Sequence, residues 1–247
     1  SNSNIKLSWN KNGNPDGTSY QINNVGGGSF TTTSSPKNFT GLDPDTNYEF
    51  KVRAKNSTGV YSSYTPKLDE YTKANVPNKP ALSNVASTSL QLDISPNSNP
   101  AHTEYAIYNT STNYYINSNG NTTTSATWQK DSAWGSQTIK NLAIDTKYSF
   151  ITKARNQDKI QTASSTKVVT TTLAAKPANF TTSTITTSSM KFSWGSNGNP
   201  SDIVYQLRNI SDNSNATTTN TSLNRKNLEV NQEYKFKLRA KNSADRR

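Results

Sequence analysis

The sequence predicts an all-β protein made of three tandem β-sandwich domains in an elongated row. Asn, Ser and Thr account for 100 of the 247 residues and good helix formers are scarce, which favours strands and turns over helices. Many short segments alternate apolar and polar residues with period two, the pattern of strands with one buried face. One pattern of segments then occurs three times, which predicts one domain per copy.

The clearest part of the repeat is an alternating strand that begins with Tyr. In the first copy Tyr48, Phe50 and Val52 share one face, while charged residues occupy the other. A Leu stands six residues before the Tyr, a spacing that predicts a tyrosine corner, in which a buried ring bonds the upstream backbone through its hydroxyl. We expect this structural role for Tyr48, Tyr148 and Tyr234.

The strands upstream of the corner also recur. Each copy has an alternating strand that ends in a bulky residue, then an Asn-x-Asn-Pro loop, then a strand that begins with Tyr. We interpret these loops as turns, because Asn and Pro favour turn conformations. The three loops are residues 12–15, 97–100 and 197–200.

Short linkers that contain proline separate the copies, and we expect domains at 1–75, 76–173 and 174–247. Because proline stiffens the linkers, three modules should form a string of about 90 to 110 Å. The first copy lacks a first strand and the third lacks a last strand, while the second has an extended central hairpin. Two interpretations stay open: the chain is part of a longer array, or a neighbouring chain supplies the missing strands.

These features together resemble the fibronectin type III family. The resemblance rests on Trp9 and Trp194 at the end of the second family strand, on the Tyr of the third, on the Leu-to-Tyr corner and on the Ala-x-Asn ending. It implies immunoglobulin-like sandwiches with seven short strands in two packed antiparallel sheets. The second copy departs from the pattern because Ile94 stands in place of the Trp.

Composition excludes several classes of function. With no cysteine, disulfide frameworks, thiolate metal sites and cysteine nucleophiles are absent. The net charge of +11 comes from scattered basic residues without a dense cluster, so we expect no specific binding of nucleic acid. No apolar run approaches the length of a membrane span.

Catalytic and metal-binding constellations are also missing from the sequence. His102 is the only histidine and falls in a predicted loop, where we expect it to be solvated. Asp43, Asp45 and Asp145 precede the corner tyrosines, in turns where Asp commonly bonds its own backbone, and a calcium-loop signature is absent. We therefore predict that the chain is not an enzyme and uses no cofactor or metal.

One aromatic cluster in the second copy is a candidate ligand contact. Tyr114, Tyr115, Trp128 and Trp134 flank an Asn-Gly turn, and aromatic rings on a sandwich surface can stack on sugar rings. The alternative is that Trp128 and Trp134 pack over the hairpin and fill a core that is short of apolar side chains.

The leading functional hypothesis is a non-catalytic structural or adhesive array: a spacer, stalk, surface-layer or filament component. The resemblance implies an extracellular or cell-surface location on a bacterium, within a longer chain, and a protein or polysaccharide surface as partner. Two alternatives stay open: an accessory carbohydrate-binding or spacer module of a polysaccharide-degrading enzyme, and a phage tail or filament repeat that self-assembles through its incomplete terminal domains.

Overall fold

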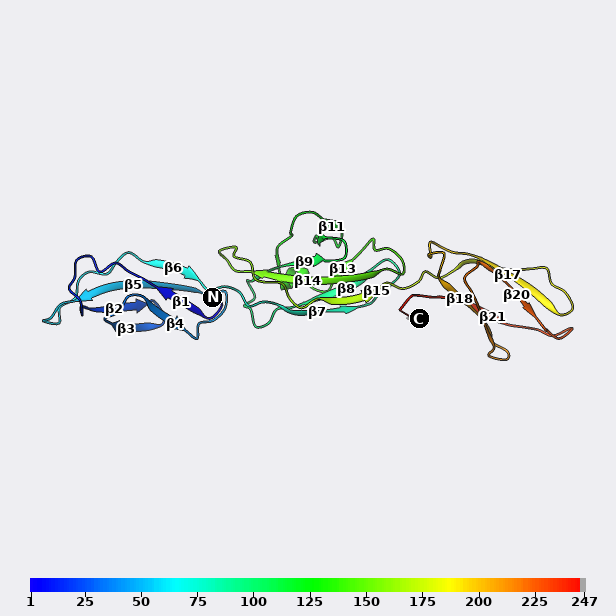
Figure 1. The fold of residues 1–247 in the computed structure, drawn as a ribbon, viewed down its shortest axis with the longest axis horizontal. Helices are drawn as coiled ribbons and strands as arrows, with labels where there is room; N and C mark the ends of the chain where they lie inside the picture. The colour runs from blue at the N-terminus through cyan, green and yellow to red at the C-terminus, as the bar shows by residue number, and fades with distance from the viewer. Residues whose placement is uncertain (245–247) are drawn as a thin grey trace.

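The computed structural model describes residues 1–244. Its sheets fall into three groups, each with its own hydrophobic core, that follow one another along the long axis of the molecule (Figure 1). Within the described residues, strands dominate and the helical content is one segment of four residues, so the all-β prediction is confirmed. No described helix has the length and apolar character needed to cross a membrane.

The first sandwich contains a two-stranded sheet, β1–β4, and a four-stranded sheet, β3–β2–β5–β6, both antiparallel. Along β2, Tyr20 and Ile22 are buried and Gln21 between them is half-buried, as the period-two alternation requires. The six strands are β1 (Asn4–Leu7), β2 (Ser19–Asn24), β3 (Gly28–Thr32), β4 (Lys37–Thr40), β5 (Asn47–Lys55) and β6 (Leu68–Tyr71).

The middle sandwich pairs a three-stranded sheet, β13–β8–β7, with a larger sheet in the order β11–β10–β9–β14–β15, in which β12 also pairs with β9. The short helix α1 follows β12 directly. The elements are β7 (Asn78–Ser83), β8 (Leu90–Ser95), β9 (Glu104–Asn109), β10 (Tyr114–Ile116), β11 (Thr122–Thr123), β12 (Gln129–Lys130), α1 (Asp131–Trp134), β13 (Gln137–Ile139), β14 (Lys147–Arg155) and β15 (Val168–Thr171).

The third sandwich has two three-stranded sheets, β16–β17–β20 and β19–β18–β21. The six strands are β16 (Ala178–Ser183), β17 (Ser189–Gly195), β18 (Val204–Asn209), β19 (Asn215–Thr218), β20 (Ser222–Lys226) and β21 (Phe236–Lys241).

The two terminal sandwiches leave sheet edges that are covered in the middle one. Strand β8 lies between β13 and β7, whereas its counterpart β1 pairs with β4 alone. Likewise β14 lies between β9 and β15, whereas β21 pairs with β18 alone among the described strands. Unpaired strand edges offer backbone donors and acceptors to another extended segment.

The corner tyrosines adopt the same geometry in all three sandwiches. The Tyr48 hydroxyl accepts the Asp43 backbone N–H at 2.9 Å, and the Tyr148 hydroxyl accepts that of Ala143 at 2.9 Å. In the third sandwich the Tyr234 hydroxyl accepts the corresponding N–H at 2.7 Å. This bond fixes the turn that precedes each of these strands, and in the first two sandwiches that turn forms one side of the contacts with the next sandwich.

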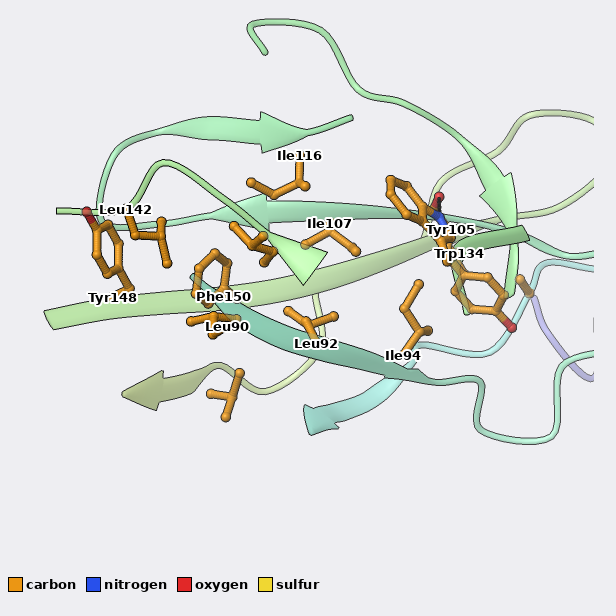
Figure 2. Close-up of a cluster of buried hydrophobic side chains, with 14 residues drawn as sticks. Leu90, Leu92, Ile94, Tyr105, Ile107, Ile116, Trp134, Leu142, Tyr148 and Phe150 are labelled. Carbon is orange, nitrogen blue, oxygen red and sulfur yellow. Dashed lines mark hydrogen bonds between the residues drawn. The ribbon is translucent and has the colours of Figure 1, made fainter. Parts of the chain in front are cut away.

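The middle core is completed by a residue from outside the repeat. Figure 2 shows Ile94, Tyr105 and Trp134 at one end of this core, and Leu142, Tyr148 and Phe150 at the other. In the outer sandwiches Trp9 packs against Tyr20, and Trp194 packs against its Tyr counterpart at a ring distance of 5.4 Å. Helix α1 therefore brings Trp134 to the end of the core where Ile94 replaces the tryptophan of the repeat.

Candidate functional site at the joints between the sandwiches

The most extensive polar network between sandwiches surrounds Asp45. Its side chain has no exposed surface, although it belongs to a turn at the end of the first sandwich. One carboxylate oxygen accepts the backbone N–H of Gln157 at 2.9 Å, and the other accepts the Thr103 hydroxyl at 2.7 Å. Both donors belong to loops of the middle sandwich, so the carboxylate links two domains. Hydrogen bonds to an ionised acceptor are the stronger kind.

Two further contacts complete this face of the first joint. Asn156 donates its side-chain N–H to the carbonyl oxygen of Thr72, just after β6, at 3.1 Å. His102 lies with Nε2 2.7 Å from the carbonyl oxygen of Asp45. Asn156 is only 1% exposed, because the end of the first sandwich covers it.

The Asn-x-Asn-Pro loop of the middle sandwich holds the linker. Asn99 accepts the backbone N–H of Asn75 at 2.6 Å and donates back to the carbonyl oxygen of the same residue at 2.9 Å. Asn97 donates to the carbonyl oxygen of Val76 at 2.8 Å. These three bonds satisfy consecutive backbone groups of an extended segment that has no sheet partner there.

The second joint repeats most of these hydrogen bonds, but Asp202 and Ile203 stand at the positions of His102 and Thr103. Asp145 accepts the backbone N–H of Ser243 at 2.7 Å, and Asn242 donates to the carbonyl oxygen of Thr172 at 3.1 Å. The linker bonds also recur: Asn199 accepts the Ala175 N–H at 2.7 Å and donates back at 2.8 Å. Asn197 donates to the carbonyl oxygen of Lys176 at 2.9 Å.

Local structure aims both aspartates across the joint. Asp45 and Asp145 have positive φ values of 45° and 47°, a conformation that Asp tolerates better than most residues. In the first joint the Thr72 hydroxyl holds the turn, since it donates to the Asp43 carbonyl oxygen at 2.6 Å and accepts the Thr46 N–H at 3.0 Å. The backbone of the turn is thus satisfied without the Asp side chain, which is left to bond the next sandwich.

This arrangement differs from the sequence-based expectation at several positions. The prediction that Asp45 and Asp145 bond their own backbone is wrong, and His102 is bonded to the neighbouring sandwich instead of only to solvent. The Asn-x-Asn-Pro loops form turns, but their asparagines also hold the linkers. The available signal was that two asparagines recur at fixed spacing in all three copies, a stricter pattern than a turn requires.

The four aromatic residues of the candidate ligand contact do not form one surface. Trp134 is 4% exposed and its indole N–H donates to the Tyr105 carbonyl oxygen at 2.9 Å, so it belongs to the core. Tyr114 is 43% exposed, while Tyr115 is half-buried and packs edge-on against Tyr108 at a ring distance of 4.8 Å.

Trp128 takes part in a separate cluster with charged residues. The Arg155 guanidinium lies 4.7 Å from the centre of the Trp128 ring and bonds Glu104 at 2.6 Å. Lys159 reaches the same carboxylate at 3.1 Å. Although burial acts to raise the pKa of Glu104, the bonds and charges of Arg155 and Lys159 outweigh it and hold this pKa below its ordinary value.

Within residues 1–244, no group of three His, Cys, Asp or Glu side chains is placed to hold a metal ion. Besides the contacts of Asp45 and Glu104, the described charged groups that come together include Lys11 with Asp16, and Lys67 with Glu49 and Asp69. These contacts stabilise the positions of the loops and strands that carry them.

Known proteins that are similar to this chain contain fibronectin type III domains. A search of curated proteins gives no match. Similar solved structures include a two-domain fibronectin type III segment of chicken tenascin, with 14% identity, a TM-score of 0.46, and coverage of 68% of this chain and 93% of that one. The FN1–FN3 domains of chicken CNTN1 have 17% identity, a TM-score of 0.30 and coverage of 98% and 90%.

The central fibronectin-III array of RIM-binding protein is similar at 13% identity and a TM-score of 0.31, with coverage of 99% of this chain and 89% of that one. The family model of the fibronectin type III domain matches residues 1–69 and 175–247, together more than half of the chain. With its sandwiches and repeated tyrosine corners, the chain belongs to the fibronectin type III family.

Proposed function

We propose that this chain is a spacer that keeps its fibronectin type III domains, 1–75, 76–173 and 174–247, in a fixed row. The observation that carries the proposal is that both joints share a common set of hydrogen bonds. In each case a turn aspartate and a loop asparagine connect the sandwiches, and two asparagines of the Asn-x-Asn-Pro loop hold the linker. Independent domains on flexible linkers would have no need for two matching sets.

The positions of the hydrogen bonds support a stiff joint. The Asp45 and Asn156 contacts connect the bodies of the two sandwiches, whereas Asn97 and Asn99 hold the linker itself. To bend at this joint, the chain would have to break the bonds between the sandwiches and the bonds to the linker together. At about 1 kcal/mol for each neutral bond and more for the charged one, bent conformations should be sparsely populated.

We further propose that the spacer belongs to an extracellular or surface protein of a bacterium, where it acts in adhesion or as part of a stalk. Support comes from the family and from a polar composition rich in Asn, Ser and Thr. Antibody labelling of intact cells of the source organism tests this location, and labelling only after lysis would contradict it.

Small-angle X-ray scattering of the full chain tests the spacer function. We expect one narrow distribution of lengths near the 90 to 110 Å estimated above. The double variant Asn99→Ala and Asn199→Ala should shorten the mean length and broaden the distribution, because both linkers lose two bonds each.

Asn119→Ala is the matched control, since Asn119 is exposed and its side chain makes no bond within the described residues. A chain that is already bent and variable without any substitution contradicts the proposal.

A further inference from the structure

The outer end of the first sandwich carries the same loops that receive the neighbouring sandwich at both joints. These loops are residues 12–15 and 56–57, and no other sandwich covers them in the described part of the chain. In Figure 1 they lie at the end of the molecule opposite the third sandwich. By their place in the repeat, Asn12, Asn14 and Asn56 correspond to Asn97, Asn99 and Asn156.

The loops already have the joint conformation. Asn12 has a φ of 50°, against 58° for Asn97. The Asn14 side-chain N–H bonds the carbonyl oxygen three residues earlier at 2.7 Å, as that of Asn99 does at 2.8 Å. The Asn56 side chain accepts the Val60 N–H at 2.8 Å and so closes its loop in the same way as its counterpart.

The groups that bond across the joints are unused at this end. Among residues 1–244, no hydrogen bond is made by the Asn14 side-chain oxygen, the Asn56 side-chain N–H or the Ser57 backbone N–H. Asn56 is exposed, whereas Asn156 is 1% exposed. Loop residues Asn14, Asn56 and Ser57 line one groove.

The open edge of β1 continues this surface along the first sandwich. Just before β1, the Ser1 amine donates to the Asn4 carbonyl oxygen at 3.1 Å. The corresponding bond before β8 in the middle sandwich joins the Ala86 N–H to the Ser89 carbonyl oxygen at 2.8 Å. A groove beside β1, lined in part by Leu7 and Tyr71, occupies the place that β7 fills in the middle sandwich. Strand β1 is followed directly by the loop at residues 12–15, so its open edge leads toward the loops at the outer end.

We propose that this surface docks the linker end of a further fibronectin type III domain that carries Asp in the turn before its corner tyrosine. The two observed joints define the occupant. Its carboxylate bonds the Ser57 N–H, its last strand offers a carbonyl to Asn56, and its extended linker lies on Asn12, Asn14 and β1. The inference rests on the proposed spacer function, since it extends the same joint to a third interface.

The required carboxylate distinguishes this occupant from the third sandwich of a second copy. At the position of Asp45 the third sandwich has Asn231, whose amide carries no charge. The groove does contain Asp16, but Lys11 binds its carboxylate at 2.5 Å. That bond, with the charge of Lys11, lowers the pKa of Asp16 and offsets its repulsion of an incoming carboxylate.

The test is a chain in which residues 76–185 are repeated directly before Ser1. The repeated segment supplies a full middle sandwich with its own Asp145, its linker and a strand for the edge of β1. Amide hydrogen exchange is measured at Ser57, with Gln157 and Ser243 as internal references for the existing joints. We expect exchange at Ser57 to be about tenfold slower than in the 247-residue chain. Asp145→Ala in the added copy alone should restore the faster rate.

The outcomes separate this inference from the spacer function. If Gln157 and Ser243 are protected but Ser57 exchanges as before, the docking surface is refuted and the spacer function stands. If all three amides exchange freely, both proposals fail. Should the extended chain not fold, a peptide of residues 172–185 is added to the 247-residue chain. This peptide carries the linker and the strand for β1 but not the carboxylate. Saturable binding that Asn12→Ala with Asn14→Ala abolishes supports the linker contacts of the surface, and no binding at about 1 mM overturns them.

Discussion

Replacement of Asp45 by alanine isolates the contribution of the carboxylate to the first joint. The change removes two charge-assisted bonds, to the Gln157 N–H at 2.9 Å and to the Thr103 hydroxyl at 2.7 Å. Bonds to charged groups contribute about 1.5 to 3 kcal/mol each. Because water can enter the gap that alanine leaves, and the buried charge disappears, we expect a net loss of about 2 kcal/mol in joint stability.

Amide hydrogen exchange at Gln157 measures this loss directly. A loss of about 2 kcal/mol corresponds to about a 30-fold faster exchange at that amide. Amides in the two cores, such as those of Ile22 and Ile107, should keep their rates because neither sandwich loses a core contact.

Asp43→Ala is the matched control for this experiment. Asp43 lies in the same turn but is exposed, and the middle sandwich already has Ala143 at this position. The reasoning is refuted if Asp45→Ala leaves Gln157 exchange within twofold of the control, since the carboxylate would then contribute nothing to the joint.

Three other predictions concern the middle sandwich. Trp134→Phe should lower its free energy of unfolding by about 1 to 3 kcal/mol, measured by urea denaturation, because the bond to the Tyr105 carbonyl oxygen is lost; unchanged stability would contradict a core role. Tyr148→Phe should cost about 1 kcal/mol in the same assay by leaving a backbone N–H of the corner unpaired, and unchanged stability would contradict a role for the hydroxyl. Since the folded-state pKa of Glu104 is lowered, its stabilisation is present above the ordinary value of 4.5 and is lost as pH falls through the lower folded value. Glu104→Gln removes the titrating carboxylate and weakens the bond to Arg155. The free energy of unfolding should therefore depend less on pH in that range, and an unchanged pH dependence would refute the assignment.

The sequence by itself determined the strands and the repeat, because these depend on local patterns. Alternation along residues 48–56 predicts a strand with one buried face, and β5 and its counterpart β14 have that pattern. The family model matches the outer copies but leaves the middle one unmatched, where Ile94 replaces the tryptophan. The repeat still indicated a sandwich there, since the corner and the alternation are present.

Only the tertiary structure decided what the polar residues of the repeat do. Asp45 bonds a residue 112 positions away, and such a contact depends on how two domain ends meet, which no local pattern encodes. Trp134 likewise looked equivalent to Trp128 in sequence, yet α1 buries Trp134 in the core and Trp128 lies outside against Arg155. Alternation of apolar residues specifies which face of a strand is buried, because the hydrophobic effect favours removal of the apolar face from water. Hydrogen bonds between domains require partners in three dimensions, so their identity becomes visible only once the domains are placed side by side.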